Sequence, residues 1–196
     1  MLKKYLETYI KENSQTVALT SFEEVYAQSN DLIHADINIK MIDLVERFSD
    51  IYVERCNKES EETLSEEGKT FLEKPISYLR DHKEEFLYVE SQSFSIIGVD
   101  SISIELDDIF ETYDVMFGLK LQKKYESDLK DTMKQLFITD QPKMAIMFNQ
   151  QDGVWDMNFA LNHIEGFYES NSIQENIQLM YQFMFEVLST IESNSK

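Results

Sequence analysis

The feature that most constrains the fold is a strict alternation of side chains between Tyr113 and Leu121. Apolar residues recur at every second position, and the positions between them are Asp114, Met116, Gly118 and Lys120. A period of two indicates a strand that buries one face and leaves the other face polar. We therefore expect an antiparallel sheet that is packed on one side only.

A hairpin near the C-terminus is indicated by a turn that ends in Asp152-Gly153. Residues 143–148 and 154–161 flank this turn, and Asp-Gly between two apolar runs is a strong hairpin signal. Alternation along the second run places four side chains on the buried face: Trp155, Met157, Phe159 and Leu161. The hairpin should therefore extend the same half-buried sheet.

Residues 75–196 are predicted to form the core, in the order α-β-β-β-α-β-β-α. Three short runs read as its first strands: 87–89, 94–99 and 102–106. Helical spacing follows over residues 123–137. The last helix begins after Ser172, where Glu175 completes a capping box.

The first 74 residues are predicted to be mainly helical. Apolar side chains at helical spacing indicate helices over residues 2–13, 21–28 and 41–58. The glutamate-rich segment Glu59–Glu67 is expected to be a solvated helix face or a mobile connector. The chain is thus predicted to be one α+β domain over residues 1–196, with helices packed on a mainly antiparallel sheet of about five strands.

The last helix has more apolar surface than one face can hold. Leu179, Phe183 and Phe185 widen its apolar stripe beyond a single side. A helix that is apolar on two sides is either central in the fold or meets a second subunit. These three residues are therefore a candidate interaction surface, including one for a homodimer.

The charge balance limits the partners of the chain. Asp and Glu number 37 against 18 Lys and Arg, which gives a formal net charge of −19. Such a field repels the phosphates of nucleic acids and the anionic surfaces of membranes. We expect no nucleic-acid or membrane binding, and either a basic protein partner or simply high solubility.

The single cysteine, Cys56, can form no internal disulfide, which fits a reducing cytoplasm. Near the N-terminus, Glu7, Lys11 and Glu12 interrupt any apolar stretch of the kind found in signal peptides. No run approaches the roughly 18 apolar residues that span a bilayer. A cytoplasmic location is therefore predicted.

The sequence offers little catalytic chemistry. Five acids lie between Glu105 and Asp114, but their spacing fits no EF-hand loop. The five glycines are too scattered to cradle a phosphate, so no cofactor is expected. Of His34, His82 and His163, only His163 is a candidate site residue, since His34 has no second ligand nearby beyond Asp36. One candidate groove or ligand face remains: Asp114, Trp155, Asp156, Asn158 and His163.

Three segments carry a resemblance to a known family: residues 47–55, 112–124 and 152–162. They resemble small uncharacterised proteins of Bacillus-like bacteria whose members are sometimes labelled branched-chain amino acid aminotransferase. That label implies pyridoxal phosphate, a Schiff-base lysine and a phosphate-binding helix N-terminus. Lys120 and Lys143 lie in strand-like segments without such a loop, so no catalytic residue is assigned.

The order of elements is also similar to that of bacterial type III secretion chaperones, which are dimers that hold partner polypeptides. We therefore expect a protein-interaction or chaperone-like adaptor without catalysis. One alternative is a small-molecule or divalent-metal-dependent enzyme with its site on the C-terminal hairpin. Another is a toxin-neutralising or phage-related inhibitor that uses the acidic face.

Overall fold

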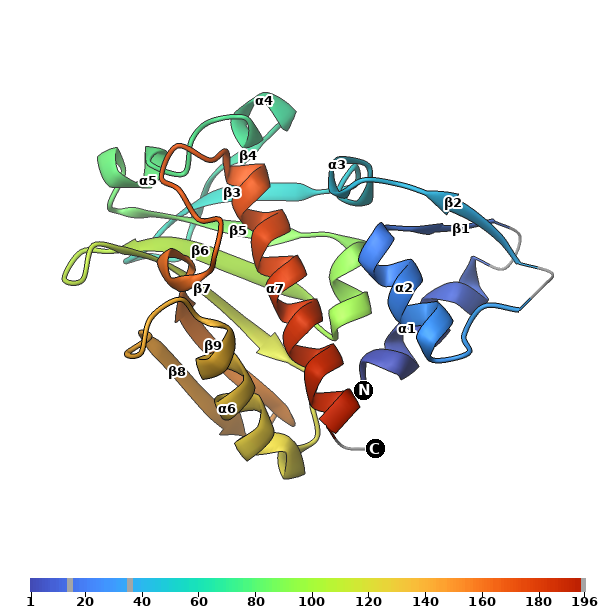
Figure 1. Cartoon of the computed structure of the whole chain (residues 1–196). Coiled ribbons are helices and arrows are strands. Elements are labelled where there is room, and N and C mark those ends of the chain that lie inside the picture. Colours follow the sequence, from blue (N-terminus) through green and yellow to red (C-terminus); the bar gives the residue numbers. More distant parts are fainter. Residues whose placement is uncertain (14–15, 35–36, 195–196) are drawn as a thin grey trace.

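The computed structural model describes residues 1–13, 16–34 and 37–194 and is built around a seven-stranded antiparallel sheet (Figure 1). The strand order is β4-β3-β5-β6-β7-β9-β8. The strands are β3 (Tyr52–Asn57), β4 (Thr63–Glu67), β5 (Glu85–Glu90), β6 (Ser101–Asp107), β7 (Thr112–Leu119), β8 (Met144–Asn149) and β9 (Val154–Ala160). The α+β class and the antiparallel sheet are confirmed, whereas a count of about five strands was too low.

The two additional strands of this sheet come from the segment predicted to be helical over residues 41–58 and from the glutamate-rich segment Glu59–Glu67. Only α3 (Leu44–Arg47) is helical there, and β3 follows it. Pairing with β5, in which Val53 lies opposite Val89, buries Val53, whereas Met41 and Val45 of the expected helical stripe are exposed. The glutamate-rich segment ends in β4, which is an outer strand, so its acids remain in contact with solvent.

The run at residues 94–99 is also not a strand. It lies in the 3₁₀ helix η1 (Gln92–Ile97), where the Ser91 hydroxyl accepts a hydrogen bond from the Ser93 amide. Gly98 then ends the helix with a φ of 70°, a conformation that favours glycine. A local cap and a left-handed glycine thus outweigh the β-propensity of the isoleucines.

The helices gather on one face of the sheet, which α7 (Ile173–Asn194) crosses (Figure 1). The predicted capping box is present: the Ser172 amide donates to Glu175 at 2.6 Å, and the Glu175 amide donates to the Ser172 hydroxyl at 3.1 Å. Beside α7 lie η2 (Lys123–Tyr125) with α6 (Glu126–Leu136) on one flank, and α1 (Leu2–Glu12) with α2 (Ser21–Ser29) on the other.

The wide apolar surface of α7 is explained by this central position. Phe183 stacks on Phe137 with ring centroids 4.9 Å apart, and Phe185 packs edge-on against Phe22, also at 4.9 Å. Their side chains are only 5% and 4% exposed, and Leu179 is half-buried. Phe183 and Phe185 therefore do not form the exposed interaction surface that the sequence suggested, because the chain's own helices cover them.

The N-terminal region is not mainly helical, since it contains four strands. Besides β3 and β4 it forms a parallel pair, β1 (Thr16–Leu19) with β2 (Asn38–Met41). A buried ion pair between Glu23 and Arg47 ties this region together, and the Tyr181 hydroxyl of α7 donates to Glu23 at 2.5 Å. The pair is compensated by these contacts, as buried charges require.

Three short elements complete the described chain: α4 (Lys69–Leu72), α5 (Tyr78–Asp81) and η3 (Leu161–His163). Pro75 does not begin a helix but forms an isolated β-bridge with Ser172. Across the described ranges, no helix combines the length and the apolar character needed to cross a bilayer.

Candidate functional site

The second face of the seven-stranded sheet stays in contact with solvent. Strand alternation directs its side chains away from α7, and most of them are half-buried or exposed. We call this surface the open face. It comprises Tyr52, Glu54, Cys56, Glu66, Phe86, Tyr88, Glu90, Ser103, Glu105, Asp107, Asp114, Met116, Lys143, Ala145, Met147, Asp156, Asn158 and Ala160.

A hollow of about 490 Å³ lies on the open face over β3, β5 and β6. Its aromatic lining comes from Phe86 and Tyr88. Its charged lining consists of three acids and one base: Glu54, Glu61, Glu105 and Lys58. The hollow therefore combines aromatic rings with an excess of negative charge.

Two pairs of acids lie directly opposite each other on neighbouring strands of the open face. Glu105 of β6 faces Asp114 of β7, and Glu54 of β3 faces Glu66 of β4. Like charges in such positions destabilise a sheet. The two pairs, which lie toward opposite ends of the open face, differ in whether lysines or arginines lie beside them.

The Glu105–Asp114 pair is neutralised by lysines of the same chain. Lys143 Nζ lies 2.6 Å from Asp114, and Lys58 Nζ lies 4.0 Å from Glu105. Burial still raises the pKa of Glu105, Lys58 partly offsets this, and the charges of Asp114 and Asp107 raise it further. This end of the face is thus a built ion-pair network rather than an unoccupied site.

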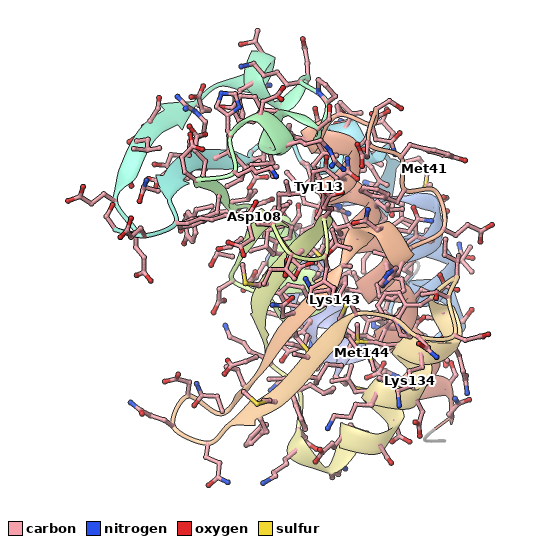
Figure 2. All side chains as sticks on the ribbon, turned by 90° about the vertical axis from the view of Figure 1, so that its left-hand side faces the viewer. Met41, Asp108, Tyr113, Lys134, Lys143 and Met144 are labelled. Carbon is pink, nitrogen blue, oxygen red and sulfur yellow. The ribbon has the colours of Figure 1, made fainter. Side chains whose placement is uncertain are left out.

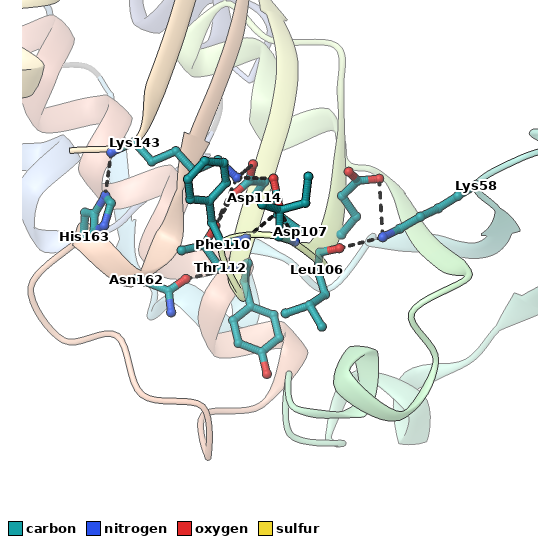
Figure 3. A network of polar contacts seen from close by, with 12 residues as sticks. Lys58, Leu106, Asp107, Phe110, Thr112, Asp114, Lys143, Asn162 and His163 are labelled. Carbon is teal, nitrogen blue, oxygen red and sulfur yellow. Dashed lines mark hydrogen bonds and ion pairs between the residues drawn. The ribbon is translucent and has the colours of Figure 1, made fainter. Parts of the chain in front are cut away.

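Lys143 is the centre of that network (Figure 3). Its ammonium donates to Asp107 at 2.5 Å and to the Thr112 hydroxyl at 3.1 Å, and the Phe110 ring lies 4.9 Å away. The hydrogen bond from Lys143, together with those from the Phe110 and Ile109 amides, lowers the pKa of Asp107 to about 2. Burial lowers the pKa of Lys143, but its bonds to Asp107 and Asp114 outweigh this effect and raise the pKa.

Lys143 reaches Asp114 across an intervening strand. Asp114 pairs with Ala160 of β9, and the Ala160 amide donates to the Lys143 carbonyl at 3.1 Å. Ala160 carries a single methyl group, which leaves room for the lysine side chain to pass above it. The role of Lys143 could not be predicted from the sequence, because its contact with Asp114 depends on the strand order β7-β9-β8. The only signal in the sequence was that Asp107 and Asp114 lie on either side of a turn.

The Glu54–Glu66 pair has no such compensation. Among the described residues, neither carboxylate lies within 4.0 Å of a Lys or Arg nitrogen. Glu54 instead accepts hydrogen bonds from the hydroxyls of Tyr52 and Thr63, the latter at 3.0 Å. The Tyr52 bond lowers the pKa of Glu54, so its carboxylate remains charged near neutral pH.

The five residues predicted as a ligand face do not converge. Asp114 and His163 both contact Lys143, because His163 Nδ1 accepts a hydrogen bond from the Lys143 amide at 3.1 Å. Asp156 and Asn158 lie on the open face. Trp155 points to the opposite side, where it is 1% exposed and donates through Nε1 to the Leu121 carbonyl at 3.1 Å. It is therefore a core residue.

The histidines offer no metal site. Burial lowers the pKa of His163, and because its Nδ1 accepts a bond the neutral ring carries its proton on Nε2. His82 stacks on Tyr78 at 3.9 Å, and Asp36, the expected neighbour of His34, lies outside the described residues. Within the described part of the chain, no three His, Cys, Asp or Glu side chains are grouped so that they could hold a metal ion.

Cys56 is buried on the open face, and burial raises the pKa of its thiol. A protonated thiol is a weak nucleophile. The chemistry that the face can provide is therefore the binding of cationic groups by uncompensated carboxylates beside aromatic rings.

Comparison with known proteins gives no match, whether to a family model, to a curated protein or to a solved structure.

Proposed function

We propose that this chain is a protein-binding adaptor without catalysis of its own, and that its open face binds a basic partner protein. The observation that carries the proposal is the Glu54–Glu66 pair, two opposed carboxylates without a Lys or Arg neighbour among the described residues. A lysine or arginine of a partner placed between them would relieve their repulsion.

The surroundings of the pair suit a cationic side chain. Phe86 and Tyr88 line the adjacent hollow, and the Tyr88 hydroxyl donates to Glu90 at 2.5 Å. Aromatic faces attract ammonium and guanidinium groups, and the stem of a lysine or arginine packs on them. Carboxylates and rings together therefore favour a basic peptide segment over an acidic or purely apolar one.

The net charge of the whole chain supports the same partner. A charge of −19 steers a basic protein toward the surface and makes the association sensitive to salt. A toxin-neutralising or phage-related inhibitor would be a special case in which the basic partner is a toxic protein. The free Cys56 supports a reducing cytoplasm as the site of this activity.

The test uses a fluorescein-labelled oligo-arginine peptide as a probe for the partner. We expect the double variant Glu54→Gln/Glu66→Gln to bind it about tenfold more weakly in a fluorescence anisotropy titration at low salt, since each lost charge contact is worth a modest energy. Raising the salt concentration should reduce the difference.

The matched control removes the same charge elsewhere. Glu12 and Glu165 are exposed and lie outside the open face, so Glu12→Gln/Glu165→Gln should change peptide binding little. Equal weakening by both double variants would show that only the net charge matters, and the proposed site would then be wrong.

A further inference from the structure

The two outer strands of the sheet differ in how their free edges are protected. Strand β4 carries a β-bulge against β3, since Arg55 lies opposite Ser65 and Cys56 lies opposite Thr63, and the strand ends in Ser65-Glu66-Glu67. Bulges and charges are the usual means of preventing an edge from pairing with another strand. The β4 edge is therefore protected.

Strand β8 has neither device. Its sequence, Met-Ala-Ile-Met-Phe-Asn, contains no charged residue and no proline, and its pairing with β9 runs without a register shift from Met144 to Asn149. In the described structure, no backbone hydrogen bond joins its outer edge to another segment. In Figure 2, β8 runs from the labelled Met144 toward the β8–β9 turn. A regular, uncharged edge of this kind is a template for strand addition.

The local charge indicates which strand would be added. Residues 141–151 contain no acid, and residues 115–151 contain six lysines against four acids. This part of the chain therefore has a net charge of about +2, whereas the whole chain has a formal net charge of −19. This region lacks the strong negative charge that repels two copies elsewhere, and its small positive excess repels a second copy only weakly.

We propose that β8 pairs antiparallel with β8 of a second copy, so that two seven-stranded sheets join into one. Antiparallel pairing of identical strands has twofold symmetry, which is the commonest symmetry of homodimers. The exposed side chains of Ala145 and Met147, the latter 69% exposed, would meet their symmetry mates across the new junction. This contact uses an edge rather than the open face, so it does not depend on the proposed partner binding.

The test compares glutamates placed on the two edges. We expect the wild-type chain to have twice its monomer mass of 23.1 kDa by size-exclusion chromatography with light scattering. The variant Ala145→Glu/Met147→Glu puts like charges opposite each other and should weaken dimerisation by about tenfold or more. Leu64→Glu, at an exposed apolar residue of β4, should leave the dimer intact.

Amide hydrogen exchange provides the second measurement. The outer amides of β8 should exchange more slowly at high than at low concentration of the wild-type protein, while those of β4 should not change. A monomeric wild type at all concentrations would overturn the proposal. So would a dimer that survives Ala145→Glu/Met147→Glu in a folded variant, or one that Leu64→Glu dissociates instead.

Discussion

The two opposed acid pairs of the open face lie on one side of a single sheet, yet only one of them is supplied with cations by the chain itself. Asp114 and Glu105 have Lys143 and Lys58, whereas Glu54 and Glu66 have hydroxyl groups at best. The first pair thus has cations of the folded chain beside it. The second pair has no Lys or Arg nitrogen within 4.0 Å among the described residues, which leaves room for an external cation.

The difference also indicates what each end of the face does. The Lys143 network joins three strands and the β6–β7 turn, so its carboxylates contribute to folding. The Glu54–Glu66 pair lies next to an outer strand and costs stability without joining distant segments. Sites that lower stability locally are where binding functions are commonly found.

The largest effect is expected when Lys143 is removed from the network around the Glu105–Asp114 pair. Lys143→Met leaves Asp114, whose side chain is 4% exposed, charged and without its cation. We expect the free energy of unfolding to fall by about 2–3 kcal/mol, as when one partner of a buried pair is removed. Urea unfolding at neutral pH measures the change.

The matched control is Lys120→Met. Lys120 pairs with Asp100 at 2.5 Å, but the two side chains are 47% and 76% exposed. An exposed pair contributes little, so the change should stay within about 0.5 kcal/mol. If both variants lost equal stability, the network would have no special role.

Lowering the pH is expected to have a smaller effect on the free energy of unfolding, through Asp107 of the Lys143 network. The pKa of Asp107 falls from 3.8 to about 2 in the folded chain. A depressed carboxyl pKa stabilises the fold above the unfolded value, and this stability is lost as the pH falls from about 4 to about 2. After solvent screening we expect about 1 kcal/mol, measured as a fall in unfolding free energy over that range.

The same titration of Lys143→Met shows whether the lysine is responsible. Without its hydrogen bond from Lys143, the Asp107 carboxyl should have a higher pKa, although the amides of Ile109 and Phe110 still lower it, so the stability should depend less on pH between about 4 and 2. If the free energy of unfolding changed equally with pH in the variant and the wild type, Lys143 would not be a cause of the lowered pKa of Asp107.

Parts of the fold could be predicted because their signals are local. The alternation along β7, the Asp152-Gly153 turn and the Ser172–Glu175 cap each lie within a few residues, and all three are confirmed. The strand β3 was missed because the spacing of the apolar residues around it does not exclude a helix, and β4 was missed because its glutamates suggested a solvated helix face or connector. Pairing with β5 overrides that local preference, as tertiary contacts often do.

The candidate site was less predictable for the same reason. Asp114, Asp156 and Asn158 were expected on the polar face of neighbouring strands, and they lie there. The Glu54–Glu66 pair could not be anticipated without the β3–β4 register, since the sequence suggested a helix and a connector in its place. A surface formed across strands is visible only once the order and register of those strands are known.

The smallest expected effect is a gain of stability at the Glu54–Glu66 pair. Its sign is opposite to the loss expected for Lys143→Met at the other end of the open face. Glu66→Gln removes one of two uncompensated like charges, so the free energy of unfolding should rise by about 0.3–0.5 kcal/mol. Glu59→Gln, at an exposed acid of the β3–β4 turn, should leave it unchanged within error. Urea unfolding at low salt measures both variants.

Adding the oligo-arginine peptide should reverse the order of the two proteins. A ligand stabilises the folded state that binds it, and it stabilises the tighter binder more. At saturating peptide the wild type should therefore become more stable than Glu66→Gln, although it is less stable alone. If Glu66→Gln were already the less stable protein without peptide, Glu66 would stabilise the fold, and the difference between the two ends of the open face would be lost.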